Sequence, residues 1–410
     1  MTAKQILVLG GGFAGLWSAL GAARKLDELG ADTDAAQVTL VNRDAYHSIR
    51  VRNYETDLSG VRVPLDDVLE PVGVRRVEGE VAGIDLGTQR VVVATRGGAE
   101  RLPYDRLVFA LGSQLARPNV PGLPEHAFDV DTYEGGARLE AHLQALPHRP
   151  ASPGRFTVVV VGAGLTGIEA ATEMPARLRA ILERARIAER GRVILADHQP
   201  RIGSDMGDFA RPVIEEALAT LGVETRVGIS VRSVSPDGLA LDSGEKIAAA
   251  TVIWCGGMRA NPLTRLFPVE HDRLGRIPVD EFLRVKGVAN LFAAGDVAVG
   301  MMDERHASVM SCQHGRPMGR FAGYNAACDL FGQPMLPLRI DWYVTVLDLG
   351  GWGALYTEGW DRQVVAKGEA AKKTKQTINC QRIYPPMTRN RREILDAAAP
   401  VVQTPPGLRH

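Results

Sequence analysis

The chain has no excess of charge of either sign: its 410 residues include 48 lysines and arginines and 48 aspartates and glutamates. Proteins that bind nucleic acids usually carry a basic excess, so this balance argues against that class, although it leaves room for a local basic patch. Apolar residues make up 45% and charged residues 23% of the chain, as in ordinary globular proteins. The length is enough for two or three domains with a large core.

Cysteine is scarce, and the first 254 residues contain none. The four cysteines, Cys255, Cys312, Cys328 and Cys380, are too few and too scattered for a disulfide framework or a paired-cysteine zinc site. We therefore expect reduced thiols, as in a cytoplasmic protein, and no metal site. The absence of a close cysteine pair also argues against a flavin-coupled dithiol, so buried, inert thiols are expected.

Long apolar runs are absent as well: none approaches the roughly 18–20 residues that a membrane-spanning helix needs. Only MTAKQ precedes the first predicted strand, which leaves no room for a signal peptide. We therefore expect a cytoplasmic protein, for which peripheral contact with the inner face of a membrane remains open.

Glycine is abundant at two places, and the first is VLGGGFAG at residues 8–15. This stretch follows an apolar run typical of a buried parallel strand and precedes a helical pattern. Gly10, Gly12 and Gly15 fit the spacing G-x-G-x-x-G, in which glycines permit a sharp turn, close approach to a pyrophosphate and tight helix–strand packing. A second predicted strand, QVTLVN, ends at Asn42.

The second stretch, VVGAGLTG at residues 160–167, repeats this spacing with Gly162, Gly164 and Gly167. A lone match is often only a structural turn. Two matches, each between a predicted strand and a predicted helix, indicate two dinucleotide sites. One tightly held redox cofactor and one exchanging hydride donor would need two sites, and FAD with a nicotinamide nucleotide is the natural pair.

The strand that follows the second stretch, RVILAD, ends at Asp197. A carboxylate at this position can accept hydrogen bonds from ribose hydroxyls and repels a 2′-phosphate. The sequence therefore favours NADH over NADPH, and nearby Arg201 weakens this preference because it could reach such a phosphate.

Two further segments resemble those of flavoprotein reductases with two dinucleotide-binding domains. GVANLFAAGDVAV resembles the segment whose aspartate, here Asp296 after Gly295, hydrogen-bonds the ribityl chain of FAD. LPYDRLVFALGSQLARPNVPG resembles the segment that leaves the FAD domain, which implies that the backbone from Ala110 to Gly112 lies near the FAD phosphates. The order of these segments implies that the first glycine stretch binds FAD and the second binds the nicotinamide nucleotide.

Within that superfamily, residues 4–335 look most like type II NADH dehydrogenases, which are NADH:quinone oxidoreductases. VTLVNRDAYHSIRVRNYE resembles their stretch near the flavin, and TVIWCGGMRANPL resembles their Trp-x-x-Gly segment beside the nicotinamide. SVMSCQHGRPMG resembles their helix near the quinone entrance. The chain departs from the family pattern with Asn42 in place of an acid and Val309 in place of a glutamine.

The resemblance implies a set of site residues. Those expected at FAD are Gly10, Gly12, Phe13, Ala14, Gly15, Asn42, Arg43, Arg50, Val81, Ala110, Gly112, Gly295 and Asp296. Those expected at NADH are Gly162, Gly164, Leu165, Thr166, Gly167, Asp197, Trp254, Gly256 and Gly257. The expected catalytic residues are Glu169, Gln313 and His314.

Each chemical role has a structural alternative. Glu169 would transfer a proton or orient the nicotinamide amide, or it is simply a carboxylate stabilised by a helix N-terminus. Arg50 would stabilise reduced flavin, or it belongs to a surface ion pair. Gln313 and His314 would line the acceptor pocket, or they cap a helix. His47 is expected to be a packing residue.

We therefore predict an α/β fold of two doubly wound, Rossmann-like dinucleotide-binding domains with a small C-terminal α+β region. The predicted boundaries are an FAD domain at 1–115 and 252–335, a linker at 116–149, an NADH domain at 150–251 and a C-terminal region at 336–410. In that region WYVTVLDLGGWGALY predicts two strands joined at Gly350-Gly351, and the segment Lys367 to Lys375 is expected to be solvated and basic.

The predicted function is hydride transfer from NADH to FAD and then two-electron transfer to a quinone-like acceptor, in a homodimer. Two alternatives stay open. One is a reductase of a small electron-transfer protein such as ferredoxin or rubredoxin, which would dock on Lys367 to Lys375. The other is a flavoprotein with mainly a binding or signalling role, since a dinucleotide fold alone does not establish a reaction.

Overall fold

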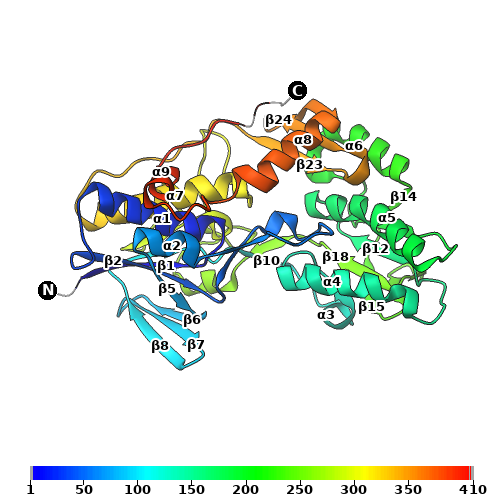
Figure 1. The fold of residues 1–410 in the computed structure, drawn as a ribbon, viewed down its shortest axis with the longest axis horizontal. Helices are drawn as coiled ribbons and strands as arrows, with labels where there is room; N and C mark the ends of the chain where they lie inside the picture. Colours follow the sequence, from blue (N-terminus) through cyan, green and yellow to red (C-terminus); the bar gives the residue numbers. More distant parts are fainter. Residues whose placement is uncertain (1–2, 406, 408–410) are drawn as a thin grey trace.

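The fold is built on two parallel five-stranded sheets, which form the two halves of the computed structural model; residues 3–405 and 407 are described. The first sheet has the order β21-β9-β1-β2-β5 and lies on the left of Figure 1. Its strands are β21 (Leu291–Ala293), β9 (Arg106–Phe109), β1 (Lys4–Leu9), β2 (Ala36–Asn42) and β5 (Arg75–Glu78). Both of its faces are covered, which explains why β1 and β9 are nearly continuous apolar runs.

Two helices cover one face of this sheet, α1 (Phe13–Glu28) and α7 (Cys312–Leu330), and they lie side by side in Figure 1. A three-stranded antiparallel meander contributes its apolar side chains to the same core from below the sheet in that view. The meander consists of β6 (Glu80–Asp85), β7 (Arg90–Thr95) and β8 (Gly98–Pro103).

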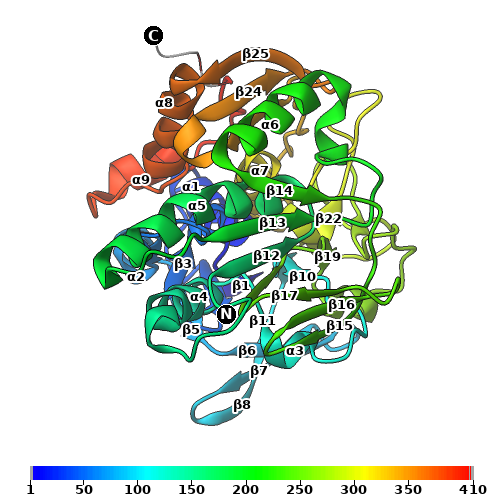
Figure 2. The same cartoon turned by 90° about the vertical axis from the view of Figure 1, so that its right-hand side faces the viewer.

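The second sheet repeats this plan in the order β11-β18-β12-β13-β14, as Figure 2 shows. Its strands are β11 (Ala127–Phe128), β18 (Thr251–Trp254), β12 (Thr157–Val161), β13 (Arg192–Ala196) and β14 (Val223–Arg226). Its helices are α4 (Tyr133–Ala145), α5 (Leu165–Ala185) and α6 (Gly207–Leu221). Its meander is β15 (Val231–Ser235), β16 (Gly238–Leu241) and β17 (Lys246–Ala248). The predicted α/β class with two doubly wound parallel sheets is confirmed.

The C-terminal region adds a three-stranded antiparallel sheet that contacts α5 and α6 of the second half. Its first two strands, β23 (Val344–Asp348) and β24 (Ala354–Glu358), meet at the predicted turn, and β25 (Gln363–Gly368) completes the sheet. Helix α8 (Glu369–Thr377), a single π-helical turn at Ile378–Arg382 and helix α9 (Arg391–Ala397) follow. Among the residues described, no helix is long and apolar enough to cross a membrane.

Short elements connect these parts. They are β3 (Tyr46–Ser48), β4 (Arg62–Pro64), α2 (Asp66–Leu69), β10 (Ser113–Leu115), α3 (Leu123–His126), β19 (Met258–Ala260), β20 (Ile277–Pro278) and β22 (Ala298–Val299). The pairs β3–β4 and β10–β19 are antiparallel, and β20–β22 is parallel.

The contact between α1 and α7 depends on glycines that let the two backbones touch. A Cβ atom added to Gly323 would lie 1.8 Å from the carbonyl oxygen of Ser18, and one added to Gly319 would lie 2.3 Å from that of Ala14. Backbone atoms cannot move aside as a flexible side chain can, so the helices would have to separate. These glycines hold the N-termini of both helices at the same end of the first sheet.

Substituting Gly323 by alanine is therefore expected to lower the free energy of unfolding by roughly 3 kcal/mol, as overpacking of a core does. The matched control is Gly83→Ala in β6, where no described atom lies within 4 Å of the added Cβ. Thermal unfolding should show a Tm several degrees lower for Gly323→Ala and a nearly unchanged Tm for Gly83→Ala. Equal Tm values for the two variants would contradict the packing argument.

Candidate functional site

The two glycine turns have the same geometry in both halves. Gly10 has φ +103° and Gly162 has φ +105°, a conformation that L side chains rarely adopt. A Cβ atom on Gly15 would lie 1.8 Å from the carbonyl oxygen of Gly10, and one on Gly167 would lie 1.7 Å from that of Gly162. The protein itself thus requires the first and third glycine of each turn.

The middle glycines are different, because nothing in the described part of the chain requires a glycine there. Gly12 has φ −73° and Gly164 has φ −75°, which any residue can adopt. No described atom lies within 4 Å of a Cβ built on Gly12, and only Asp205 Oδ2 approaches one built on Gly164, at 3.4 Å. The missing side chains therefore leave open space in front of the helices α1 and α5.

That open space fits the phosphates of a dinucleotide. Gly12 and Gly164 are the N-cap residues of α1 and α5, and within the described chain neither cap offers a side chain to the first N–H groups. Exposed N–H groups and the positive end of the helix dipole favour a bound phosphate. The expected site residues Phe13 and Ala14, and Leu165 and Thr166, open these two helices.

A polar residue at the end of the strand that follows each glycine turn accepts a hydrogen bond from the turn. The N–H of Gly11 donates to Asn42 Oδ1 at 2.8 Å, and the N–H of Ala163 donates to the carboxylate of Asp197. The Asn42 amide also donates to the carbonyl of Asp44 at 3.0 Å. An amide oxygen accepts this bond as a carboxylate does, so asparagine can replace an acid here. Neighbouring Arg43 is exposed.

Arg50 and Asp296 are brought together although 246 positions separate them. The Ser113 hydroxyl donates to Asp296 at 2.6 Å and accepts from Arg50 at 3.0 Å, and Arg50 Nη1 lies 3.8 Å from Asp296 Oδ2. Asp131 also accepts from Arg50 Nε at 2.7 Å. Burial raises the pKa of Asp296, although Ser113 and Arg50 oppose this. No local pattern in the sequence marks Ser113 or Asp131 as part of this cluster.

Two other expected FAD residues, Gly112 and Gly295, are the chain neighbours of Ser113 and Asp296. Gly112 has φ +69° and open space around it, and the carbonyl of Ala110 lies 2.5 Å from a Cβ built on Gly10. Gly295, with φ +77°, packs against Ala14. Val81, in contrast, has its side chain in the core of the first half.

On the second half, β18 ends at Trp254, and Gly256 and Gly257 follow the strand. The indole N–H of Trp254 donates to the carbonyl of Ala116 at 3.0 Å, and a Cβ built on Gly256 would lie 2.7 Å from that nitrogen. Gly257 has φ +91°, and within the described chain no atom lies within 4 Å of its Cβ position. The indole thus fixes this loop while space remains at Gly257.

Glu169 forms a buried ion pair that the sequence did not predict. Its Oε1 accepts from Lys375 Nζ at 2.6 Å and from the N–H of Asp348 at 3.1 Å. Burial raises the pKa of Glu169, although Lys375 opposes this. Burial alone would lower the pKa of Lys375, but Glu169 outweighs it and the pKa is raised.

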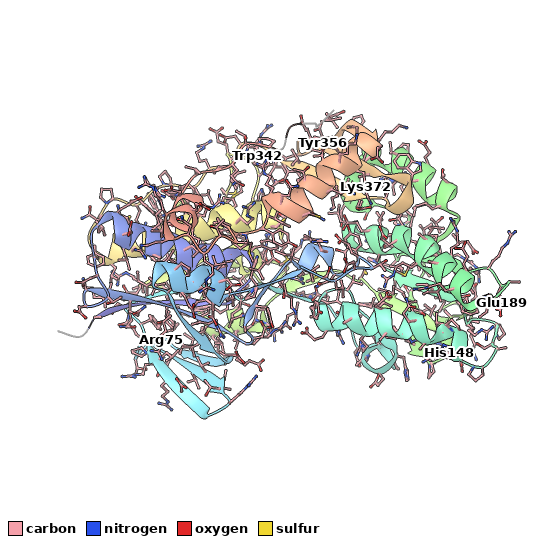
Figure 3. All side chains as sticks on the ribbon, in the orientation of Figure 1. Arg75, His148, Glu189, Trp342, Tyr356 and Lys372 are labelled. Atoms are coloured by element: carbon pink, nitrogen blue, oxygen red, sulfur yellow. The ribbon has the colours of Figure 1, made fainter. Side chains whose placement is uncertain are left out.

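The expectation of a solvated basic segment from Lys367 to Lys375 is therefore wrong for Lys372 and Lys375, whereas Lys367 and Lys373 are exposed. Lys375 is buried, Lys372 pairs with Asp348 at 2.6 Å, and Lys367 pairs with Glu216 at 3.1 Å. Lys372 is labelled in Figure 3, where α8 meets the helices of the second half. The sequence contains one indication that Lys375 is buried: Ala371, Thr374 and Lys375 are three and four positions apart, and they share the buried face of α8.

Gln313 and His314 open α7, but they do not share a pocket. Gln313 lines a pocket beneath the C-terminal region, where its Oε1 accepts from the N–H of Val344 at 3.4 Å. The imidazole of His314 is fully buried, and its Nδ1 accepts from the N–H of Val309 at 2.9 Å. Burial lowers the pKa of His314 to about 4, so its ring is neutral at pH 7.

The cysteines offer no redox pair. All four are free thiols. Burial raises the pKa of Cys255 to about 12 and also raises that of Cys312, which makes both poor nucleophiles.

Comparisons with known proteins agree with this geometry. Residues 4–319 match the family model described as pyridine nucleotide-disulphide oxidoreductase. An NADH dehydrogenase-like protein of Mycobacterium tuberculosis is 58% identical over 402 residues, which are 98% of this chain and all of that protein. A demethylphylloquinone reductase of Synechocystis is 29% identical over 86% of each chain. The solved structure of NDH2 from Plasmodium falciparum with NADH superposes with a TM-score of 0.75 at 14% identity, over 96% of this chain and 97% of that one.

The Glu169–Lys375 pair can be tested by removing one partner. Lys375→Met leaves a buried carboxylate without its cation, which is expected to cost roughly 3–5 kcal/mol of stability. Lys373→Met is the control, because Lys373 is exposed on the same helix. Thermal unfolding of the double variant Glu169→Gln/Lys375→Met should show less destabilisation than the sum of the two single variants. Strict additivity would show that the pair does not couple.

Two buried histidines predict a loss of stability in acid. Burial lowers the pKa of His47 and of His314 to about 4, whereas an unfolded chain binds these protons near pH 6.5. Acidification from pH 7 to pH 5 therefore favours the unfolded state by about 2 kcal/mol per histidine. The fall in Tm between these pH values should be smaller in His47→Gln than in the wild type. The exposed control His148→Gln should keep the wild-type fall, and identical falls in all three proteins would refute the argument.

Proposed function

The chain belongs to the family of pyridine nucleotide-disulphide oxidoreductases, and from this premise we propose that it oxidises NADH with bound FAD and passes two electrons to a quinone. The observation that carries the proposal is the pair of glycine turns with open space at Gly12 and Gly164. One turn serves each dinucleotide, with FAD on the first half and NADH on the second. The names of the related proteins, an NADH dehydrogenase-like protein and a demethylphylloquinone reductase, support this assignment.

The residues present in the first half fit FAD. The α1 N-terminus would bind its pyrophosphate, and Asp296 would accept a hydrogen bond from its ribityl chain. The Arg50 guanidinium, already held by Asp131 and Ser113, would place a positive charge near the ring system. The chemistry that FAD supplies when bound is acceptance of a hydride from a nicotinamide ring and release of two electrons.

On the donor side, the α5 N-terminus would bind the pyrophosphate of NADH. Asp197 would repel a 2′-phosphate, and Gly257 would allow the nicotinamide to approach closely. Glu169, on the first turns of α5, would hold a proton shared with Lys375 Nζ, in a pair from which water is largely excluded. That proton would be available to the reduced acceptor.

A quinone is the preferred acceptor because Gln313 lines a mostly apolar pocket between α7 and the C-terminal region. His314 does not line that pocket, so we assign it a structural role and assign Gln313 the contact with the acceptor. The alternative of a protein acceptor needs an unpaired basic face. The lysines considered for it are ion-paired at positions 367, 372 and 375, which counts against that alternative.

The cofactor assignment predicts that two matched substitutions weaken the binding of two different dinucleotides. Gly12→Val should fill the space at the α1 N-terminus and yield protein with little flavin, whereas the wild type should release FAD. Gly164→Val should retain FAD but bind NADH roughly 10-fold more weakly or worse, about 1.4 kcal/mol. Flavin absorbance and NADH titration measure both effects. Wild-type protein that cannot be loaded with FAD would contradict the proposal.

The acceptor assignment predicts an effect on one half-reaction only. Gln313→Leu should slow reoxidation of the reduced enzyme by a water-soluble quinone roughly 10-fold, the scale of a lost positioning group. Reduction by NADH should remain at the wild-type rate, and stopped-flow absorbance separates the two steps. Gln333→Leu, an exposed position beyond α7, serves as the control. Reoxidation of the Gln313 variant at the wild-type rate would show that the quinone does not bind in this pocket.

A further inference from the structure

The pocket beside Gln313 contains an unusual group of three arginines. Arg316 and Arg320 lie one and two turns further along α7 than Cys312, and Arg382 reaches the same pocket from the π-helical turn. Aromatic and aliphatic side chains form most of the remaining wall, among them Trp342 and Val402. Trp342 is labelled in Figure 3 beside the C-terminal segments. The pocket therefore combines apolar walls with positive charge.

Two of these arginines are buried without a counter-charge. Arg316 is 7% exposed and Arg320 is 2% exposed, yet neither forms an ion pair with a carboxylate among the described residues. Burial, assisted by the charge of Arg382, lowers the pKa of Arg316 to about 10. Burial, assisted by the charges of Arg316 and Arg382, lowers the pKa of Arg320 to about 9. A buried cation normally needs an anion beside it, because its desolvation is otherwise uncompensated.

The hydrogen-bonding capacity of the pocket is also unfilled. Within the described residues, Nε of Arg316, Nε of Arg320 and Nε2 of Gln313 are buried and have no hydrogen-bond partner. The Trp17 ring lies 4.3 Å from the guanidinium of Arg320 and 5.2 Å from that of Arg316. Such a cation–π contact is worth only about 0.5–2 kcal/mol and does not neutralise the charge. These three nitrogens are therefore unpaired within the described residues, while Arg320 Nη1 donates to the carbonyl of Val401 at 3.5 Å.

We propose that this pocket selects an anionic aromatic acceptor, a quinone-like ring that carries a carboxylate, with its acid group bound between Arg316, Arg320 and Arg382. The ring would lie against the apolar wall and reach Gln313 at the α7 N-terminus. Guanidinium groups bind carboxylates through paired hydrogen bonds, which suits these donors. This inference rests on the proposed function, since it names the substrate class of the acceptor pocket.

Binding of two non-reducible probes to the FAD-loaded protein tests the charge selection without redox chemistry. 2-Naphthoate and 2-naphthylmethanol share a ring system, but only the first is an anion. Calorimetry should give a Kd at least about 10-fold lower for 2-naphthoate, equivalent to about 1.4 kcal/mol. Equal affinities in the wild type would overturn the inference, and this comparison needs no variant.

Substitutions of single arginines then test which residues cause the preference for 2-naphthoate over 2-naphthylmethanol. Arg316→Gln and Arg320→Gln should bring the ratio of the two affinities close to one, whereas Arg316→Lys keeps the charge and should retain part of it. Arg392→Gln removes the same charge from a side chain that is 91% exposed and should leave the ratio unchanged. If Arg320→Gln fails to fold, Arg316→Gln still decides: an unchanged ratio in it would overturn the inference.

Competition between 2-naphthoate and a quinone allows the anion site and the proposed function to fail independently. 2-Naphthoate should compete with 2-methyl-1,4-naphthoquinone and leave reduction by NADH unaffected; competition with NADH instead would overturn the inference. An enzyme that reduces neutral quinones but binds both probes equally contradicts the inference and leaves the proposed function standing. Selective, Arg316-dependent binding of 2-naphthoate by a protein that reduces no quinone supports the anion site and contradicts the proposed function.

Discussion

The architecture depends on one steric constraint, which occurs twice: a carbonyl oxygen of the strand–helix turn lies against the Cα of a glycine five residues later. In the first half the oxygen belongs to Gly10 and the glycine is Gly15, and in the second half they are Gly162 and Gly167. Any side chain at the later position would push helix and strand apart. The contact fixes each helix N-terminus at the carboxyl edge of its sheet, and the open space at Gly12 and Gly164 follows from that placement.

The candidate site becomes complete only where distant parts of the chain meet. The pair of α1 with α7 brings the pocket lined by Gln313 close to the first glycine turn, through backbone contact at Gly319 and Gly323. The pair of Glu169 with Lys375 joins α5 to α8 across 206 positions of sequence. The first contact lies within the first half, whereas the second joins the second half to the C-terminal region, which makes that region part of the site.

The sequence predicted those features that depend on neighbouring residues. The two turns, the parallel sheets and the strand pair at Gly350-Gly351 are local patterns of glycine and apolar residues, and the structure has all of them. The resemblance to known flavoproteins also selected Arg50 and Asp296, which the structure places together. The assignment of the expected site residues to FAD and NADH stays a prediction, and so do the domain boundaries.

Features that depend on long-range partners were missed for a physical reason. Lysine is normally solvated, and although the helical spacing of Ala371, Thr374 and Lys375 is compatible with a buried face, nothing local identifies Glu169 as the partner of Lys375. Arginine on a helix is normally solvated, and Arg316 and Arg320 are buried by distant parts of the chain, Trp17 of α1 and the segment around Val402. His314 stood beside Gln313 in sequence, but successive helical residues point in different directions, which separates their environments.

The central claim is that one chain carries electrons from NADH through FAD to a quinone. Anaerobic mixing of the purified flavoprotein with one equivalent of NADH, followed by a water-soluble quinone, tests it most directly. The account predicts that flavin absorbance is bleached by NADH in a single fast phase and restored in full by the quinone. Flavin that NADH does not bleach, or reduced flavin that quinones leave bleached while a small iron–sulfur protein restores it, would contradict the account.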